Sequence, residues 1–230
     1  MQKKILTIAL GTALALAASG AYAGNGNPND IRIGGYFVHY DTSSTDITGQ
    51  FTPAGLNTSI ENVSTLYLAY VRTLSSHFQV EFAFGYPPVT YAKGRGPATV
   101  GSVPFNGVEI ASIRWVSPTV LLEYDFFSPE ARWRPFVGVG VNYTKFIDRQ
   151  ITAAGAAVSG GPTSISLPSS VGPAVTAGIT YHMNDRWHFT ASYSIAQVNS
   201  KLTTDTAGIL RSNEVHFWPN AAVLSVGYSF

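Results

Sequence analysis

The chain lacks cysteine and is poor in charge. None of its 230 residues is cysteine, which excludes a disulfide framework and cysteine-based metal sites. Charged residues make up 12% of the chain, about half of the usual share of roughly 25%. The 14 basic residues face 13 acidic ones, and no run of lysine or arginine occurs. Because nucleic-acid binding calls for a basic patch or stripe, we predict no nucleic acid as a partner.

The N-terminal apolar run is too short to span a membrane. Lys3 and Lys4 precede an apolar stretch over residues 5–18, and Ala21-Tyr22-Ala23 follows it. A transmembrane helix needs about 20 apolar residues, whereas a basic start, a short apolar core and an A-x-A site are typical of a secretory signal peptide. We therefore predict a signal peptide at residues 1–23 and a single mature domain at residues 24–230. Loss of the two lysines leaves 12 basic against 13 acidic residues, a net charge of −1.

Aromatic residues are abundant at 13%, yet no later apolar run reaches helical membrane length. A membrane protein without spanning helices has to be a closed barrel, because only closure satisfies the backbone groups of every strand in lipid. Each strand needs roughly 9 to 11 residues to cross the hydrocarbon. The alternation of apolar and polar residues that is typical of strands recurs in eight segments of this length or slightly more: 31–40, 63–74, 77–89, 116–127, 135–147, 172–183, 187–199 and 217–230.

The connections between these segments alternate strictly between short and long. The short ones are residues 75–76, 128–134 and 184–186, and the long ones are 41–62, 90–115, 148–171 and 200–216. This is the arrangement of periplasmic turns and extracellular loops in outer-membrane proteins. We therefore predict an all-β fold, an eight-stranded antiparallel up-and-down transmembrane β-barrel in the bacterial outer membrane. A secreted β-sandwich is the alternative, but it would not require this alternation.

Four stretches carry a family resemblance: "FQVEFAFGYPP", "VSPTVLLEYDF", "RPFVGVGVNYTKF" and the terminal "VGYSF". Together they resemble the successive signatures of the OmpW family, which includes the AlkL-like proteins. The resemblance implies a barrel with a narrow apolar passage that admits small hydrophobic molecules from outside and releases them sideways into the membrane. It also implies that the barrel-assembly machinery reads the terminal aromatic strand. We expect a monomer in outer-membrane lipid, with small hydrophobic solutes as ligands and no cofactor.

The inward side chains sort by height in the predicted barrel. Arg32, Glu81, Glu123 and Asp125 fall in the periplasmic half, where charges in a narrow lumen should pair into a polar plug. That plug is either purely structural or part of the transport path. An eight-stranded barrel holds at most one small ligand beside its side chains. The predicted channel-lining residues above the plug carry no charge: Tyr67, Ala69, Ala83, Gly85, Gly140, Val171 and Thr176.

Prolines mark a candidate exit in the barrel wall. Proline lacks the N–H that a β-ladder requires and is normally confined to sheet edges or bulges. Pro87, Pro88 and Pro118 lie near the extracellular ends of two neighbouring segments. Several ladder hydrogen bonds should therefore be missing in one patch, which predicts a lateral exit there; the alternative is that these prolines merely end the strands. Relative to the family pattern, Ala83 and Val171 remove side-chain volume, which predicts a wider apolar channel.

Two other functions remain open from the sequence. A structural or receptor-type surface barrel would keep its lumen closed and use its long polar loops to bind a partner. A lipid-modifying enzyme would need a nucleophile and a base in register at one rim. The five histidines are scattered without metal-binding spacing: His39, His77, His182, His188 and His216. We therefore predict a channel and not an enzyme, with no catalytic, cofactor-binding or metal-binding residues.

Overall fold

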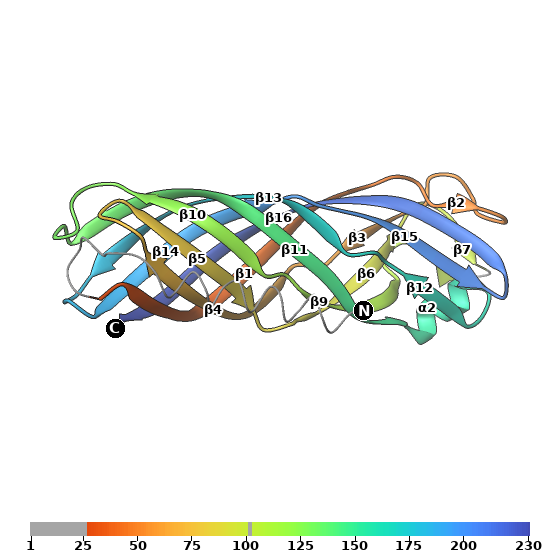
Figure 1. Cartoon of the computed structure of the whole chain (residues 1–230). Coiled ribbons are helices and arrows are strands. Elements are labelled where there is room, and N and C mark those ends of the chain that lie inside the picture. Colours follow the sequence, from red (N-terminus) through yellow and green to blue (C-terminus); the bar gives the residue numbers. More distant parts are fainter. Residues whose placement is uncertain (1–26, 101–102) are drawn as a thin grey trace, which may run out of the picture.

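Eight strands form a closed antiparallel barrel (Figure 1). The computed structural model describes residues 27–100 and 103–230, so the predicted signal peptide lies outside the described residues. Each barrel strand pairs with the next, and the last pairs with the first, which confirms the predicted fold. The strands are β1 (Asn29–Ser44), β4 (Val63–Thr73), β5 (Phe78–Gly85), β10 (Thr119–Asp125), β11 (Trp133–Ile151), β13 (Ser170–His182), β14 (Trp187–Ala196) and β16 (Ile209–Ser229).

The first and last strands close the barrel along their whole shared length. Pairing between β1 and β16 runs from Asp30 opposite Ser229 to Ser44 opposite Val215. At the periplasmic rim the amide of Phe230 donates to the carbonyl of Asn29 at 2.8 Å. Closure leaves neither of these strands with an unpaired edge, which is the condition for crossing lipid. In the part of the chain that the structure describes, no helix is both long and apolar enough to span a membrane.

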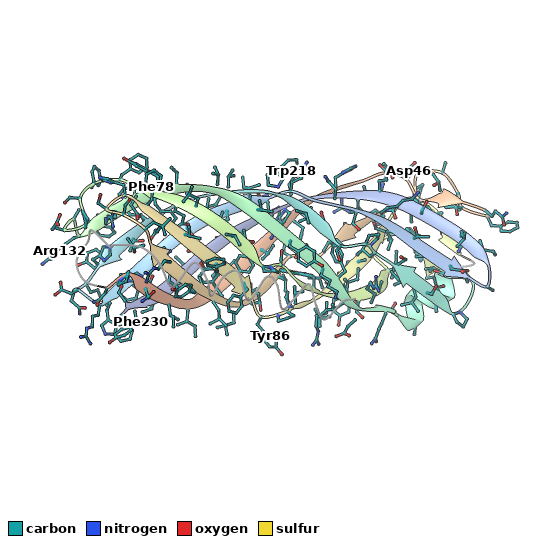
Figure 2. All side chains as sticks on the ribbon, viewed as in Figure 1. Asp46, Phe78, Tyr86, Arg132, Trp218 and Phe230 are labelled. Atoms are coloured by element: carbon teal, nitrogen blue, oxygen red, sulfur yellow. The ribbon has the colours of Figure 1, made fainter. Side chains whose placement is uncertain are left out.

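Side chains alternate between a lumen face and a lipid face. In β11 the side chain of Phe136 is 2% exposed, whereas Val139, three positions on, is 62% exposed. Strand geometry turns successive side chains to opposite faces, so the apolar outward set can meet lipid. Figure 2 places Phe78 and Phe230 near the end that carries Arg132, and Tyr86 and Trp218 near the middle of the long axis. These exposed aromatic residues suit the two interfaces of the membrane.

The barrel continues beyond the membrane as a strand-built extension (Figure 1). The long connections, which we expected to be loops, form strands that pair with one another or with the ends of β11 and β16. Their serine and threonine side chains give little apolar alternation, so the sequence pattern missed them. The strands of the extension are β2 (Thr48–Gly49), β3 (Asn57–Ile60), β6 (Val89–Arg95), β7 (Thr99–Val100), β8 (Val103–Pro104), β9 (Glu109–Val116), β12 (Thr163–Ser166) and β15 (Val198–Thr206). One short helix, α2 (Ala153–Ser159), lies among them.

Candidate functional site

A buried ion-pair network crosses the lumen in its periplasmic half. Arg32 is 3% exposed, and its guanidinium donates to Asp30 through Nε at 3.0 Å and to Glu81 through Nη1 at 2.8 Å. Glu81 also accepts a hydrogen bond of 2.7 Å from the hydroxyl of Tyr67. The Nε2 atom of His188 lies 3.0 Å from the Asp30 carboxylate. One cation therefore joins two carboxylates that come from different strands of the barrel.

A second polar group adjoins this network. The side-chain amide of Gln79 donates to Glu123 at 2.9 Å and to Asp125 at 3.3 Å. Arg134 lies 3.7 Å from Asp125 and donates to the carbonyl of Ser76 at 2.6 Å. Gln79, Glu123 and Asp125 are each at most 7% exposed. We call the two groups together the lumen floor: Asp30, Arg32, Gln79, Glu81, Glu123, Asp125, Arg134 and His188.

The structure thus brings together the four charged residues that the sequence assigned to a polar plug. Sequence reasoning missed Asp30 and Arg134 because each lies one position outside a predicted strand segment, whereas β1 begins at Asn29 and β11 at Trp133. The signal was available in parity, since Asp30 shares a face with Arg32, and Arg134 shares a face with Phe136. Among the described residues, no three histidine, aspartate or glutamate side chains gather in an arrangement that could hold a metal ion.

The lumen floor separates two cavities. The lower cavity, of about 430 Å³, lies on the periplasmic side and is lined by Arg32, Asp125 and Arg134 among other polar residues. The upper cavity, of about 80 Å³, lies on the extracellular side and has Glu81 at its base. Because Arg32 and Glu81 form an ion pair at 2.8 Å, that pair stands between the two spaces. A straight path to the periplasm therefore passes through buried charge.

The upper cavity is mainly apolar. Its buried apolar lining residues include Val38, Ile113, Trp115, Phe146, Leu167 and Val198. Of the predicted channel-lining residues, Tyr67, Ala83 and Gly85 line this cavity. Ala69, Gly140 and Thr176 lie on inward-facing positions but outside the lining of the upper cavity.

Val171 does not line the lumen, and this expectation was wrong. Its side chain is 69% exposed, whereas its neighbour Ser170 is 7% exposed. Regular alternation along β13 from Thr176 and Ala174 back to Ser170 turns position 171 to the outer face. The residue therefore adds no width to the channel. Of the two departures from the family pattern, Ala83 and Val171, only Ala83 affects the volume of the upper cavity.

The barrel wall is interrupted where the predicted exit lies. Pairing between β5 and β10 stops at Ala83 opposite Thr119, and pairing between β6 and β9 resumes at Val89 opposite Arg114. Residues 84–88 therefore lie opposite residues 115–118 without registered pairs. These two segments, which contain Pro87, Pro88 and Pro118, are called the wall break below. Five residues facing four make an irregularity of one residue, and prolines supply no N–H to repair it.

The wall break borders the upper cavity. Phe84 and Gly85 line that cavity from one side of the break, and Ser117 and Thr119 line it from the other side. Phe84 is also 48% exposed on the outer surface. On the far side of residues 115–118 the ladder continues, since the amide of Tyr143 donates to the carbonyl of Pro118 at 3.0 Å. The seam towards β11 is therefore continuous beside the break, whereas on the other side registered pairs stop at Tyr67 opposite Gly85 and resume at Ile60 opposite Ala92.

The closed barrel, its aromatic bands and its polar lumen floor define the class of protein as a small outer-membrane β-barrel. A sequence model of the OmpW family matches residues 31–230, and the chain belongs to this family. Outer membrane protein W of Vibrio cholerae is 28% identical over 165 residues, which cover 72% of each chain. The dibenzothiophene metabolism operon protein PahQ of Pseudomonas aeruginosa is 27% identical over 82% of this chain and 80% of its own length.

A solved structure has the same fold. The crystal structure of the outer membrane protein OprG from Pseudomonas aeruginosa superposes with a TM-score of 0.80. The superposition covers 90% of this chain and 98% of that one at 23% sequence identity. The family match, the relatives named outer membrane protein W and the barrel locate the protein in the bacterial outer membrane.

Proposed function

We propose that this barrel mediates passive uptake of small hydrophobic molecules. They enter the apolar upper cavity from the extracellular side and leave laterally through the wall break into the membrane. The observation that carries the proposal is the contact between an apolar cavity and an interrupted seam of the wall, directly above a charged floor. The relative PahQ, which is named for dibenzothiophene metabolism, supports an apolar cargo.

The charged floor supports sideways release over straight passage. An apolar solute moving towards the periplasm would have to separate Arg32 from Glu81, which would leave Glu81 buried with only the Tyr67 hydroxyl as a partner. Breaking a buried pair in this way costs about 3–5 kcal/mol. Passage through the wall break instead meets Phe84, Gly85 and the prolines, where no ladder hydrogen bond has to be broken. The lateral route therefore has the lower barrier for an apolar molecule.

The extracellular half supports entry through apolar surroundings. A tip cavity of about 120 Å³ lies within the extension and is lined partly by Leu56, Phe105 and Ile110. The small buried side chains of Ala92, Ala111 and Val215 belong to the same hydrophobic core as the apolar residues that line the upper cavity. Such side chains leave little bulk to displace, so modest motion of the extension would connect the two cavities.

Uptake into liposomes tests this function. Reconstituted protein should speed the entry of naphthalene relative to protein-free vesicles, and it should have little effect on glucose. Replacing Pro87, Pro88 and Pro118 together by valine, threonine and valine should allow the seam to pair and should slow naphthalene uptake several-fold. Equal acceleration of both solutes, or none of either, would contradict the proposal. The matched control is Pro173→Val, a proline of β13 that lies away from the wall break.

A further inference from the structure

A cluster of four polar side chains lies in the apolar upper cavity beside the wall break. Asn142 and Thr144 project from β11; Ser117 lies between β9 and β10, and Thr119, the first residue of β10, follows Pro118. The side-chain amide of Asn142 donates to the hydroxyl oxygens of Ser117 and Thr119, each at 2.8 Å. The hydroxyl of Thr144 donates to the Asn142 carbonyl oxygen at 2.8 Å and lies 2.7 Å from the Ser117 hydroxyl. These four residues are called the polar cluster.

Every donor of the polar cluster is already used. Thr144 gives its proton to Asn142, so the Ser117 hydroxyl is the donor in the contact between Ser117 and Thr144. Thr119 gives its proton to the backbone carbonyl of Ser117 at 3.3 Å. Hydroxyl and amide oxygens each have two lone pairs, and each oxygen here accepts only one of these hydrogen bonds. The cluster can therefore accept a hydrogen bond from a ligand but has none to offer.

The same cavity holds a buried donor. Trp115 is 7% exposed and lines the cavity, and its indole N–H interacts with the Tyr40 hydroxyl and has no second acceptor within the described chain. Trp115 and Ser117 are two positions apart in the chain, and both line this cavity. A buried indole N–H normally has an acceptor. An oxygen atom of a ligand in the cavity would be a further acceptor beside the Tyr40 hydroxyl.

We propose that the upper cavity selects small apolar molecules that carry one hydroxyl group, such as phenols and short alcohols. The ligand hydroxyl donates to the polar cluster and accepts from Trp115, while the apolar body fills the rest of the cavity. Anionic ligands fit poorly, because Glu81 is the charged residue in the lining. This proposal rests on the proposed function, because it concerns the same upper cavity, and it adds the class of molecule that the cavity binds.

A matched ligand pair tests the selectivity by binding alone. p-Cresol and p-xylene differ by a hydroxyl in place of a methyl group. The protein, folded in lipid nanodiscs with 15N-labelled tryptophan, is titrated with each compound, and the indole N–H resonance of Trp115 is followed by NMR. We expect p-cresol to shift this resonance at a free concentration about five- to tenfold below that of p-xylene, the ratio that one net hydrogen bond gives. Trp115→Phe assigns the resonance among the four tryptophans.

Variants then locate the effect. Thr144→Val keeps the shape of the side chain and should remove most of the preference for p-cresol while leaving p-xylene binding unchanged. Ser117→Ala is a second variant with the same expectation, and heat-modifiable gel migration checks that each variant folds. Thr180→Val is the control, because Thr180 is equally buried but lines the lower cavity. Its preference for p-cresol should equal that of the unaltered protein.

Two outcomes would overturn the inference. Equal midpoints of the Trp115 titrations with p-cresol and p-xylene would show that the ligand hydroxyl is not recognised. Shifts confined to the other tryptophans, Trp133, Trp187 and Trp218, would show partition into the surrounding lipid only. The titration needs no transport, so its result is separate from that of the uptake assay. Naphthalene uptake without a binding preference for p-cresol would contradict the hydroxyl selectivity alone. A binding preference for p-cresol without naphthalene uptake would contradict the proposed uptake function alone.

Discussion

Replacing Arg32 by methionine removes the cation that joins two carboxylates in the lumen floor. The side chains of Arg32, Asp30 and Glu81 are 4%, 10% and 7% exposed, so solvent screens the pairs little. Removing one partner of a buried pair leaves an uncompensated charge, which costs about 3–5 kcal/mol. With a urea m-value of about 3 kcal/mol/M, the unfolding midpoint should fall by about 1–1.7 M. Tryptophan fluorescence of the barrel in detergent micelles follows the transition.

Two further variants test the reasoning behind this number. Lys93→Met removes one side of the solvent-screened pair between Lys93 and Glu61, whose side chains are 34% and 38% exposed, and should lower the midpoint much less than Arg32→Met does. Adding Glu81→Gln to Arg32→Met removes one stranded charge but keeps an acceptor for the Tyr67 hydroxyl, and it should restore part of the loss. A midpoint for Arg32→Met equal to that of Lys93→Met would refute the claim that the lumen floor is a low-dielectric charged network.

Three other substitutions have defined outcomes. Gly140→Leu should prevent folding, because a Cβ atom there would collide with the backbone carbonyl of Val120 on β10; a heat-modifiable band of normal intensity on gels would contradict this. Ala83→Leu should fill part of the upper cavity and reduce naphthalene uptake several-fold in liposomes with the barrel intact, whereas the outward-facing Val171→Leu should leave uptake unchanged; the reverse order of effects would be inconsistent with the lumen described above. Phe230→Ser should slow insertion by purified barrel-assembly machinery, measured as the rate at which protease protection appears, and an unchanged rate would remove the terminal aromatic residue as an insertion signal.

The sequence could predict the barrel because period-2 alternation reports which face a residue occupies. Alternation placed Arg32, Glu81, Glu123 and Asp125 in one lumen. It could not report the register between strands, and register decides that Gln79 bridges Glu123 and Asp125. The strand ends were also out of reach, which is why Arg134 was missed. Strands β3, β12 and β15 of the extension carry serine and threonine on both faces, so their pairing depends on backbone hydrogen bonds that composition does not report.

The wall break, too, could be predicted from the sequence only in part. Three prolines in neighbouring segments predicted an interruption, because the missing N–H is a property of the residue itself. The offset of one residue between the lower and upper registers follows only from the pairing of distant strands. The polar cluster was likewise invisible, since Ser117, Thr119, Asn142 and Thr144 have no spacing that brings them together in the chain.

A cross-link over the wall break tests lateral release most directly. The chain has no native cysteine, so Phe84→Cys with Pro118→Cys places one thiol on each side of the break, and a short thiol-reactive cross-linker can join them. The control pair is Val80→Cys with Leu122→Cys, at positions that already face each other in the intact ladder between β5 and β10. Lateral release predicts that cross-linking at 84 and 118 slows naphthalene uptake into liposomes several-fold, while cross-linking at 80 and 122 does not. Equal uptake with both cross-links would contradict it.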